Sequence, residues 1–449
     1  MKTMIALLAL LLLLIGTGAA RAENGQTVDL ATALRAALAA RPAAEAARQQ
    51  AQAAQAAVGE ARGGYLPQLS FSETFSATDE PAGSLFMTLN QQRLVLYPDA
   101  GPYNDPGTTR DYQTRFSLRQ ALFDPDVGYG LKKARKGAAA ARATARWSAE
   151  QAVFDAFGAY LRVQQAAAAR DWVESSLQEA REVVRLARER ESAGVGLHAD
   201  TLRARVRLAE AERHRLSAAN DLRLAKRRLA LAMGRDGGEI GIARPLTADD
   251  VATGRDLAPV PRADLRAARL QADAATLERR QAKARYLPRL GLQADYTWHD
   301  HQAPLGTEAD SWQAGVGLHW DLFDGLRRER HIERTAAQAR AARLQAEELR
   351  RGIDLQRQEA RLRAEEAQLQ LASARQARAE AEESHRLLME RYRAGLTDLS
   401  DLLAAQAALD RARYDAVAAE SRMLLTRGNL RLQQGIFLQS MLPEQEDQQ

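Results

Sequence analysis

Three adjacent side chains in this sequence are of types that could do metal chemistry. His299, Asp300 and His301 supply imidazole and carboxylate groups, which are ordinary ligands of zinc. They fall in a short surface loop to which we assign no further ligand, so an ordinary polar loop is the favoured interpretation. We therefore expect no metal site and no other cofactor.

The sequence contains none of the common catalytic motifs. It holds no Gly-x-Ser-x-Gly nucleophile turn, no His-Glu-x-x-His zinc motif and no glycine-rich phosphate loop. No residue is therefore assigned a catalytic role, and we expect a protein that is not an enzyme.

Two aspartates occupy equivalent places after glycine turns. Asp200 follows Gly194-Val195-Gly196-Leu197, and Asp401 follows Gly395-Leu396-Thr397. Carboxylates repeated around a narrow opening would repel anions and attract cations. Alternatively, each aspartate only caps the helix that follows its turn, because Asp is a favoured N-cap residue. The residues alone leave both roles open, and the two roles are compatible.

The chain is internally duplicated. Asp200 and Asp401 are 201 residues apart, and so are Gly194 and Gly395. Two further motifs recur upstream: Leu122-Phe123-Asp124 as Leu322-Phe323-Asp324, and Tyr65-Leu66-Pro67 as Tyr286-Leu287-Pro288. The Leu-Phe-Asp motifs are 200 residues apart and the Tyr-Leu-Pro motifs 221. Motifs that recur in the same order at such similar offsets indicate one structural unit that is present twice.

The duplication gives the expected organisation of the chain. Residues 23–234 form the first repeat and residues 263–434 the second. Residues 235–262, rich in Gly and Pro, connect the repeats and either pack around the helices as a collar or serve only as a linker. Residues 435–449 are expected to form a polar, partly disordered tail.

Residues 1–22 have the pattern of a secretory signal peptide. Lys2 gives the positive start, an apolar run follows, and Ala20-Arg21-Ala22 matches a cleavage site. The mature chain is therefore expected outside the cytoplasm, and it has no cysteines with which to form disulfides. The net charge falls from +5 to +3 once Lys2 and Arg21 are removed, which argues against nucleic acid as a partner.

Each repeat follows the pattern helix, strand pair, long helix, turn, helix. Periodic apolar residues, ended by glycine or proline, predict these helices: Val28–Arg62, 130–192, a helix ending at Met233, Ala263–Arg285, Leu326–Ala394 and one beginning near Leu402. Arg and Glu alternate along them, which is typical of solvated helix faces.

The predicted strands alternate apolar and polar residues over about the ten positions that a tilted membrane strand needs. They are Tyr65–Thr78, Tyr112–Phe123, Arg289–Trp298 and Trp312–Phe323. The residues expected to face lipid are Phe116, Leu118, Leu290, Leu292, Tyr296, Trp298, Trp312, Val316, Leu318 and Trp320. A half-buried sheet of a soluble protein would also alternate, so this alternative stays open.

No segment after the signal is apolar for long enough to form a membrane helix. If the chain spans a membrane, it must therefore do so with strands closed into a barrel. Membrane barrels begin at about eight strands, so four predicted strands require an oligomer, and a trimer would supply about twelve.

The order of elements, the duplication and the turn Tyr392–Leu403 resemble the TolC-like outer-membrane efflux family over nearly the whole mature chain. The resemblance implies an α+β membrane protein: a trimeric twelve-strand β-barrel continued by a long α-helical barrel. It also implies an exit duct in the outer membrane that extends into the periplasm. Such ducts serve tripartite efflux pumps or type I secretion systems, with a periplasmic adaptor and an inner-membrane transporter as partners.

The resemblance also implies roles for tip residues. Asp401 matches an acidic residue that rings the periplasmic constriction, while Thr397 stands where some members carry a basic gate residue. A second acidic ring would fall on Ala404, so this chain lacks it. Asp200 and Tyr392 match a hydrogen-bonded pair that holds the tip closed. The residues that match adaptor-contacting turns are Gly194, Val195, Gly196, Leu197, Gly395 and Leu396.

A soluble periplasmic coiled-coil adaptor or scaffold is the alternative from another class. It leaves the aromatic-ended strand pairs unexplained. A charged side chain at Gly196 is expected to block docking without unfolding the helices. The sequence does not separate drug, metal-ion and protein cargo.

Overall fold

The computed structural model describes residues 24–252 and 257–442; the predicted signal peptide lies outside these residues. The chain divides into two compact units. The helical unit comprises the described residues of Met1–Arg48, Thr144–Leu265 and Leu349–Gln449. The sheet unit comprises Gln49–Ala143 and Arg266–Glu348.

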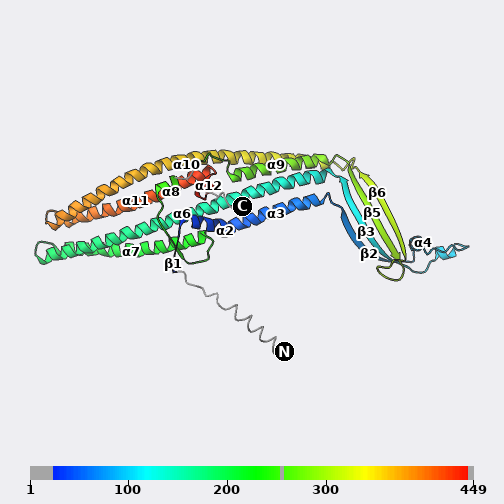
Figure 1. The fold of residues 1–449 in the computed structure, drawn as a ribbon, viewed down its shortest axis with the longest axis horizontal. Helices are drawn as coiled ribbons and strands as arrows, with labels where there is room; N and C mark the ends of the chain where they lie inside the picture. Colours follow the sequence, from blue (N-terminus) through cyan, green and yellow to red (C-terminus); the bar gives the residue numbers. More distant parts are fainter. Residues whose placement is uncertain (1–23, 253–256, 443–449) are drawn as a thin grey trace, which may run out of the picture. The chain divides into compact units, whose positions relative to one another are not determined.

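The sheet unit contains a four-stranded antiparallel sheet in the order β2-β3-β5-β6 (Figure 1). Its strands are β2 (Gln68–Thr78), β3 (Thr109–Phe123), β5 (Arg289–Asp300) and β6 (Ala309–His319). The period-2 alternation thus predicted all four strands. The last predicted strand ends early, because Trp320 leaves the ladder and its indole N–H donates to the carbonyl of Tyr286 at 2.9 Å.

The register places the predicted apolar faces on the same side of the sheet. Phe71 pairs with Phe116, Phe116 with Tyr296, and Tyr296 with Trp312. Directly paired residues of antiparallel strands point to the same face, so these aromatic side chains form one row. Leu292 pairs with Val316 on the same face.

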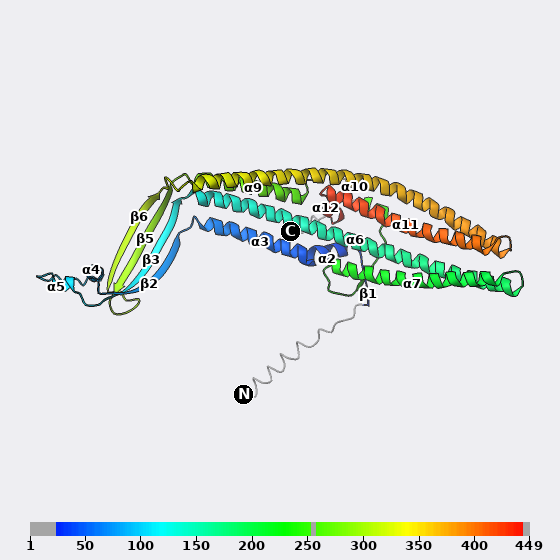
Figure 2. The same ribbon diagram turned by 180° about the vertical axis from the view of Figure 1, so that it is seen from behind.

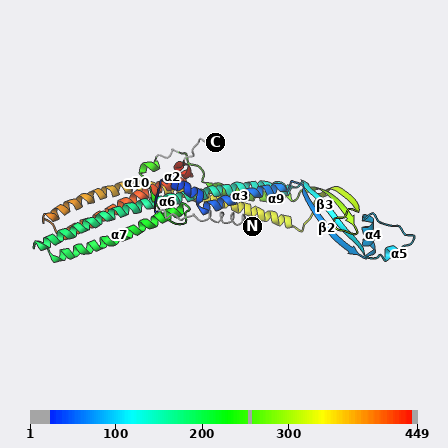
Figure 3. The same cartoon turned by 60° about the horizontal axis from the view of Figure 1, so that its bottom comes forward.

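The loop between β2 and β3 carries two short helices. They are α4 (Pro81–Asn90) and α5 (Gly101–Asn104), which lie beyond the strand ends in Figure 3. The side-chain amide of Gln91 donates to the carbonyl of Arg110 at 2.7 Å and to the carboxylate of Asp111 at 2.9 Å. These bonds hold the loop against the start of β3.

In the part of the chain that the structure describes, seven helices of ten or more residues lie outside that loop. They are α2 (Leu30–Ala40), α3 (Pro42–Gly63), α6 (Pro125–Ser192), α7 (His198–Ala232), α9 (Ala263–Ala284), α10 (Arg327–Arg393) and α11 (Leu399–Gln433). The single helix predicted over Val28–Arg62 is wrong, since it is interrupted at Arg41. That residue has an extended ψ of 122°, as the residue before a proline prefers.

Within the described residues, no helix combines the length and the hydropathy needed to cross a membrane.

The core of the helical unit is built around aromatic side chains. Phe157 and Tyr160 of α6 are fully buried, and so is Phe437 of α12 (Phe437–Met441). The rings of Phe157 and Phe437 lie 5.6 Å apart, edge to face. Gly428 faces Phe157 so closely that a Cβ atom there would lie 2.5 Å from the ring. The described part of the predicted polar tail therefore includes a packed helix, because Phe437 anchors it.

The connection between repeats packs against the helical unit. Its strand β4 (Glu239–Ile242) pairs in parallel with β1 (Asn24–Val28), and a short helix α8 (Ala248–Ala252) follows. The hydroxyl of Tyr160 donates to the carbonyl of Arg244 at 2.7 Å. Gln164 exchanges two hydrogen bonds of 2.9 Å with the backbone of Leu246. Of the two alternatives for this segment, the structure favours the packed one.

Candidate functional site

Two helical hairpins of the helical unit end in glycine turns at the same end of that unit (Figure 2). One turn joins α6 to α7, and Gly194 within it has a φ of 74°. The other joins α10 to α11, and Gly395 has a φ of 76°. Positive φ ends a helix at little cost only in glycine, so both turns are fixed by residue type. We call these two turns the tips.

The tips expose apolar side chains. Val195, Leu197 and Leu396 each keep 68% of their surface accessible, although they lie at the ends of long solvated hairpins. Gly196, in contrast, is confined: a Cβ there would lie 2.9 Å from Cβ of Arg190 and 3.0 Å from backbone atoms. A side chain at Gly196 would therefore strain the turn as well as add a charge, so Val195 is the better position at which to test docking.

Tyr392 joins the two hairpins at the tips. It is 3% exposed, and it packs with Val184 of α6 and Leu402 of α11. The guanidinium of Arg190 lies 4.9 Å from its ring centroid, and Nη1 donates to its carbonyl at 2.6 Å. Burial raises the pKa of Tyr392, Arg190 opposes the shift, and Asp200 adds to it. Arg190 thus clamps Tyr392 from the neighbouring hairpin.

The predicted hydrogen bond between Asp200 and Tyr392 is absent among the described residues of this single chain. Asp200 instead lies 3.6 Å from the guanidinium of Arg203. The closing role of the Asp200 and Tyr392 pair therefore stays a prediction. Sequence reasoning did not find Arg190, because nothing local separates it from the other arginines of α6.

The two aspartates do not serve as N-caps. The N-cap of α7 is Leu197 and that of α11 is Asp398, so Asp200 and Asp401 lie in the first helical turns. Asp401 is exposed and accepts a 3.0 Å hydrogen bond from the hydroxyl of Thr397. A carboxylate in a first turn interacts favourably with the helix dipole, and Asp401 remains free to face solvent.

Glu191 closes the first tip. Its carboxylate accepts a hydrogen bond from the hydroxyl of Thr201 at 2.6 Å and lies 2.6 Å from Nδ1 of His198. These two contacts lower the pKa of Glu191. Glu191 therefore fixes the start of α7 against the end of α6, which positions the exposed Val195 between them.

A partly buried ion-pair network joins the hairpins farther from the tips. Arg207 of α7 bonds to the carboxylate of Asp410 of α11, which also accepts a 3.2 Å bond from Ser176 of α6. Glu179 of α6 pairs with Arg413 of α11 at 3.2 Å. Burial raises the pKa of Asp410, and Arg207 opposes this effect. We call these residues the hairpin lock.

A cavity of about 670 Å³ lies beside the hairpin lock. Both Arg207 and Asp410 line it, together with Trp172, whose buried indole N–H has no hydrogen-bond partner among the described residues.

The apolar face of the sheet is exposed. The accessible fractions are 75% for Trp312, 61% for Val316, 66% for Leu318 and 53% for Trp320, which follows the end of β6. Phe116 and Tyr296 are exposed at 38% each, while neighbouring strands half-bury Leu118, Leu290, Leu292 and Trp298. Large apolar side chains exposed together on one face mark a surface that contacts a membrane or another protein.

The opposite face of the sheet carries charged and polar groups. Ser117 donates to Asp295 at 2.5 Å, and Gln293 donates to the same carboxylate at 2.8 Å. An apolar face opposite a polar face, with β2 and β6 as open edges, is the arrangement of a membrane barrel wall.

These features define a membrane protein with a strand-built wall and paired helical hairpins. A sequence model described as outer membrane efflux protein matches residues 33–235 and 256–435, so the chain belongs to that family. No curated protein matches the chain in sequence.

Several solved structures share the fold. The outer membrane protein VceC of Vibrio cholerae is 19% identical, with a TM-score of 0.75 over 90% of this chain and 96% of that one. The CmeC outer membrane channel of Campylobacter jejuni is 12% identical, with a TM-score of 0.75 over 93% and 87%. The MtrE outer membrane channel of Neisseria gonorrhoeae is 16% identical, with a TM-score of 0.74 over 93% and 91%.

Family membership confirms the expected location and class. The protein is an efflux channel of the outer membrane that extends into the periplasm, and the soluble adaptor alternative is excluded. Its family consists of channels rather than enzymes.

Proposed function

We propose that three copies of this chain form the exit duct of a pump, docked at the tips by a periplasmic adaptor and fed by an inner-membrane transporter. The trimer is supported by the four-stranded sheet, whose two edge strands are unpaired in the single chain. An unpaired edge in lipid costs several kcal/mol per backbone group, so the edges must pair between copies. Three copies give about twelve strands, enough for a barrel with an open lumen. Conduction is passive, and no residue is assigned a catalytic role.

The tips are the proposed docking surface for the adaptor. Val195, Leu197 and Leu396 present apolar side chains that the chain itself leaves uncovered. Substitution Val195→Glu is expected to reduce adaptor binding by at least about tenfold, since a buried charge costs well over 1.4 kcal/mol. Surface plasmon resonance with purified adaptor measures this change in affinity. Leu216→Glu on α7, at a position 65% exposed, is the matched control; equal losses in both variants would remove the tips from docking.

Asp401 is the proposed selectivity residue of the periplasmic mouth. Three exposed carboxylates in a ring attract cations and repel anions. Asp401→Ala is expected to lower the cation-to-anion permeability ratio, measured from reversal potentials in planar bilayers under a salt gradient. Asp398→Ala removes the same charge from the preceding turn and serves as control. An unchanged ratio in Asp401→Ala would exclude this role.

A further inference from the structure

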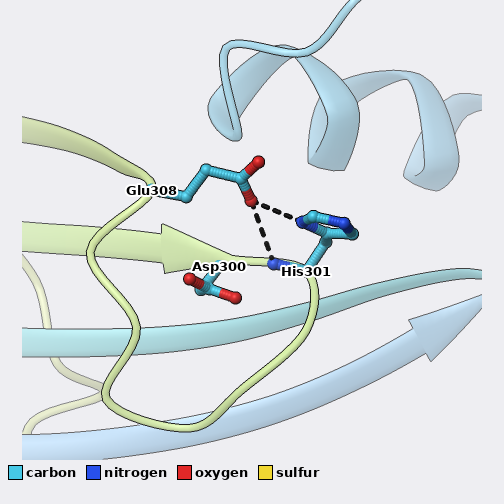
Figure 4. A group of neighbouring side chains, drawn as sticks. All are labelled: Asp300, His301 and Glu308. Carbon is cyan, nitrogen blue, oxygen red and sulfur yellow. Dashed lines mark hydrogen bonds and ion pairs between the residues drawn. The ribbon is translucent and has the colours of Figure 1, made fainter.

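The loop between β5 and β6 brings three metal-ligand side chains together. Asp300 is the last residue of β5, His301 follows it, and Glu308 directly precedes β6. One donor atom from each lies within 4.8 Å of the others. Figure 4 shows the carboxylate of Glu308 beside the imidazole of His301, with Asp300 on the neighbouring strand end. Nδ1 of His301 is 2.5 Å from the Glu308 carboxylate.

The loop holds this arrangement through its own backbone. The carboxylate of Asp300 accepts hydrogen bonds from the amides of Gln302 at 2.7 Å and Ala303 at 3.0 Å. Gly306 lies directly over Asp300, so a Cβ at Gly306 would be 2.0 Å from its carboxylate. The backbone N–H of His301 also donates to Glu308 at 3.4 Å. These backbone hydrogen bonds hold the carboxylates of Asp300 and Glu308 close to His301.

The third ligand is one that the sequence did not indicate. The sequence offered His299, but its ring turns to the polar face of the sheet and lies 2.8 Å from the carboxylate of Asp111. Glu308 takes its place because the loop folds back on the end of β5. The other oxygen of Glu308 lies 3.4 Å from the guanidinium of Arg93.

We propose that Asp300, His301 and Glu308 bind a divalent cation of the zinc class. One imidazole nitrogen and two carboxylate oxygens are a donor set that such ions accept, with water completing the coordination. The ion would tie the end of β5 to the start of β6. Arg93 opposes binding, because its positive charge pairs with one of the ligands.

Isothermal titration of ZnCl2 into untagged, chelator-treated protein in detergent tests the site. Wild type should bind one ion per chain, and His301→Ala and Glu308→Gln should each weaken binding at least about tenfold. The Arg93→Ala variant should bind zinc more tightly, because the guanidinium that pairs with Glu308 is removed. His319 lies 3.2 Å from Asp321, and among the described residues the two belong to no group of three metal-ligand side chains. The His319→Ala variant should therefore bind zinc as wild type does.

Two results would overturn the site. One is wild-type protein that takes up no zinc at millimolar concentration. The other is His301→Ala binding as tightly as wild type, which would place the ion elsewhere. Either result would leave the proposed channel function standing, because that proposal is argued from the sheet and the hairpins.

Discussion

Replacing Arg207 with alanine is expected to loosen the two hairpins from each other and to raise the conductance of the channel. The substitution leaves the carboxylate of Asp410, whose side chain is only 13% exposed, without its guanidinium partner. Removing one member of a buried ion pair costs about 3–5 kcal/mol. We expect a loss of stability at the lower end of this range, because the side chain of Arg207 is still 21% exposed. The thermal midpoint of the helical unit and the single-channel conductance in bilayers measure the two effects.

Two further variants separate the hairpin lock from a general loss of charge. Arg203→Ala removes an arginine one turn away, whose contact with Asp200 is exposed, and should change stability by less than about 1 kcal/mol. The double variant Arg207→Met, Asp410→Leu should recover stability, because an apolar pair leaves no buried charge unpaired. If Arg207→Ala matched Arg203→Ala in both readouts, the lock would have no role in holding the hairpins.

Placing an arginine at Val316 is expected to prevent assembly in the outer membrane. Val316 lies in the middle of β6 on the apolar face, 61% exposed and paired with Leu292. An arginine near the bilayer midplane of a barrel costs about 2–4 kcal/mol per chain, and a trimer would carry this cost three times. The amount of folded protein in the outer-membrane fraction, judged by heat-modifiable migration, should fall severalfold.

The neighbouring glycine provides the control for this prediction. Gly315 points to the opposite face at the same depth, and a Cβ added there meets no atom within 4 Å. Gly315→Arg should therefore reach the outer membrane in near wild-type amounts. Equal assembly of Val316→Arg and Gly315→Arg would contradict the assignment of the apolar face to lipid.

The repeating elements could be predicted from sequence because their signals are local. The alternation of apolar and polar residues along β5 and β6 predicts both strands and their apolar face. Gly194 and Gly395 predict the two tips. The break before Pro42 was missed although proline is a local signal, because the apolar pattern continues across it.

The contacts that join distant segments could not be predicted. Arg190 and Tyr392 are 202 positions apart, and Arg207 and Asp410 are 203 apart, so no periodicity links them. An arginine-rich helix offers many equivalent partners until the fold selects one. The sequence predicts a polar tail at Phe437, because the partners of this ring, Phe154 and Phe157, lie far away in the chain.

The central claim is that this chain closes its open sheet by forming a trimer in the outer membrane. Native mass spectrometry tests this most directly. The processed protein is extracted from membranes in detergent, the detergent is removed in the gas phase, and the mass of the intact assembly is measured. We predict a single species of three times the chain mass, dependent on detergent for solubility. A monomer, or a protein released without detergent, would contradict the account.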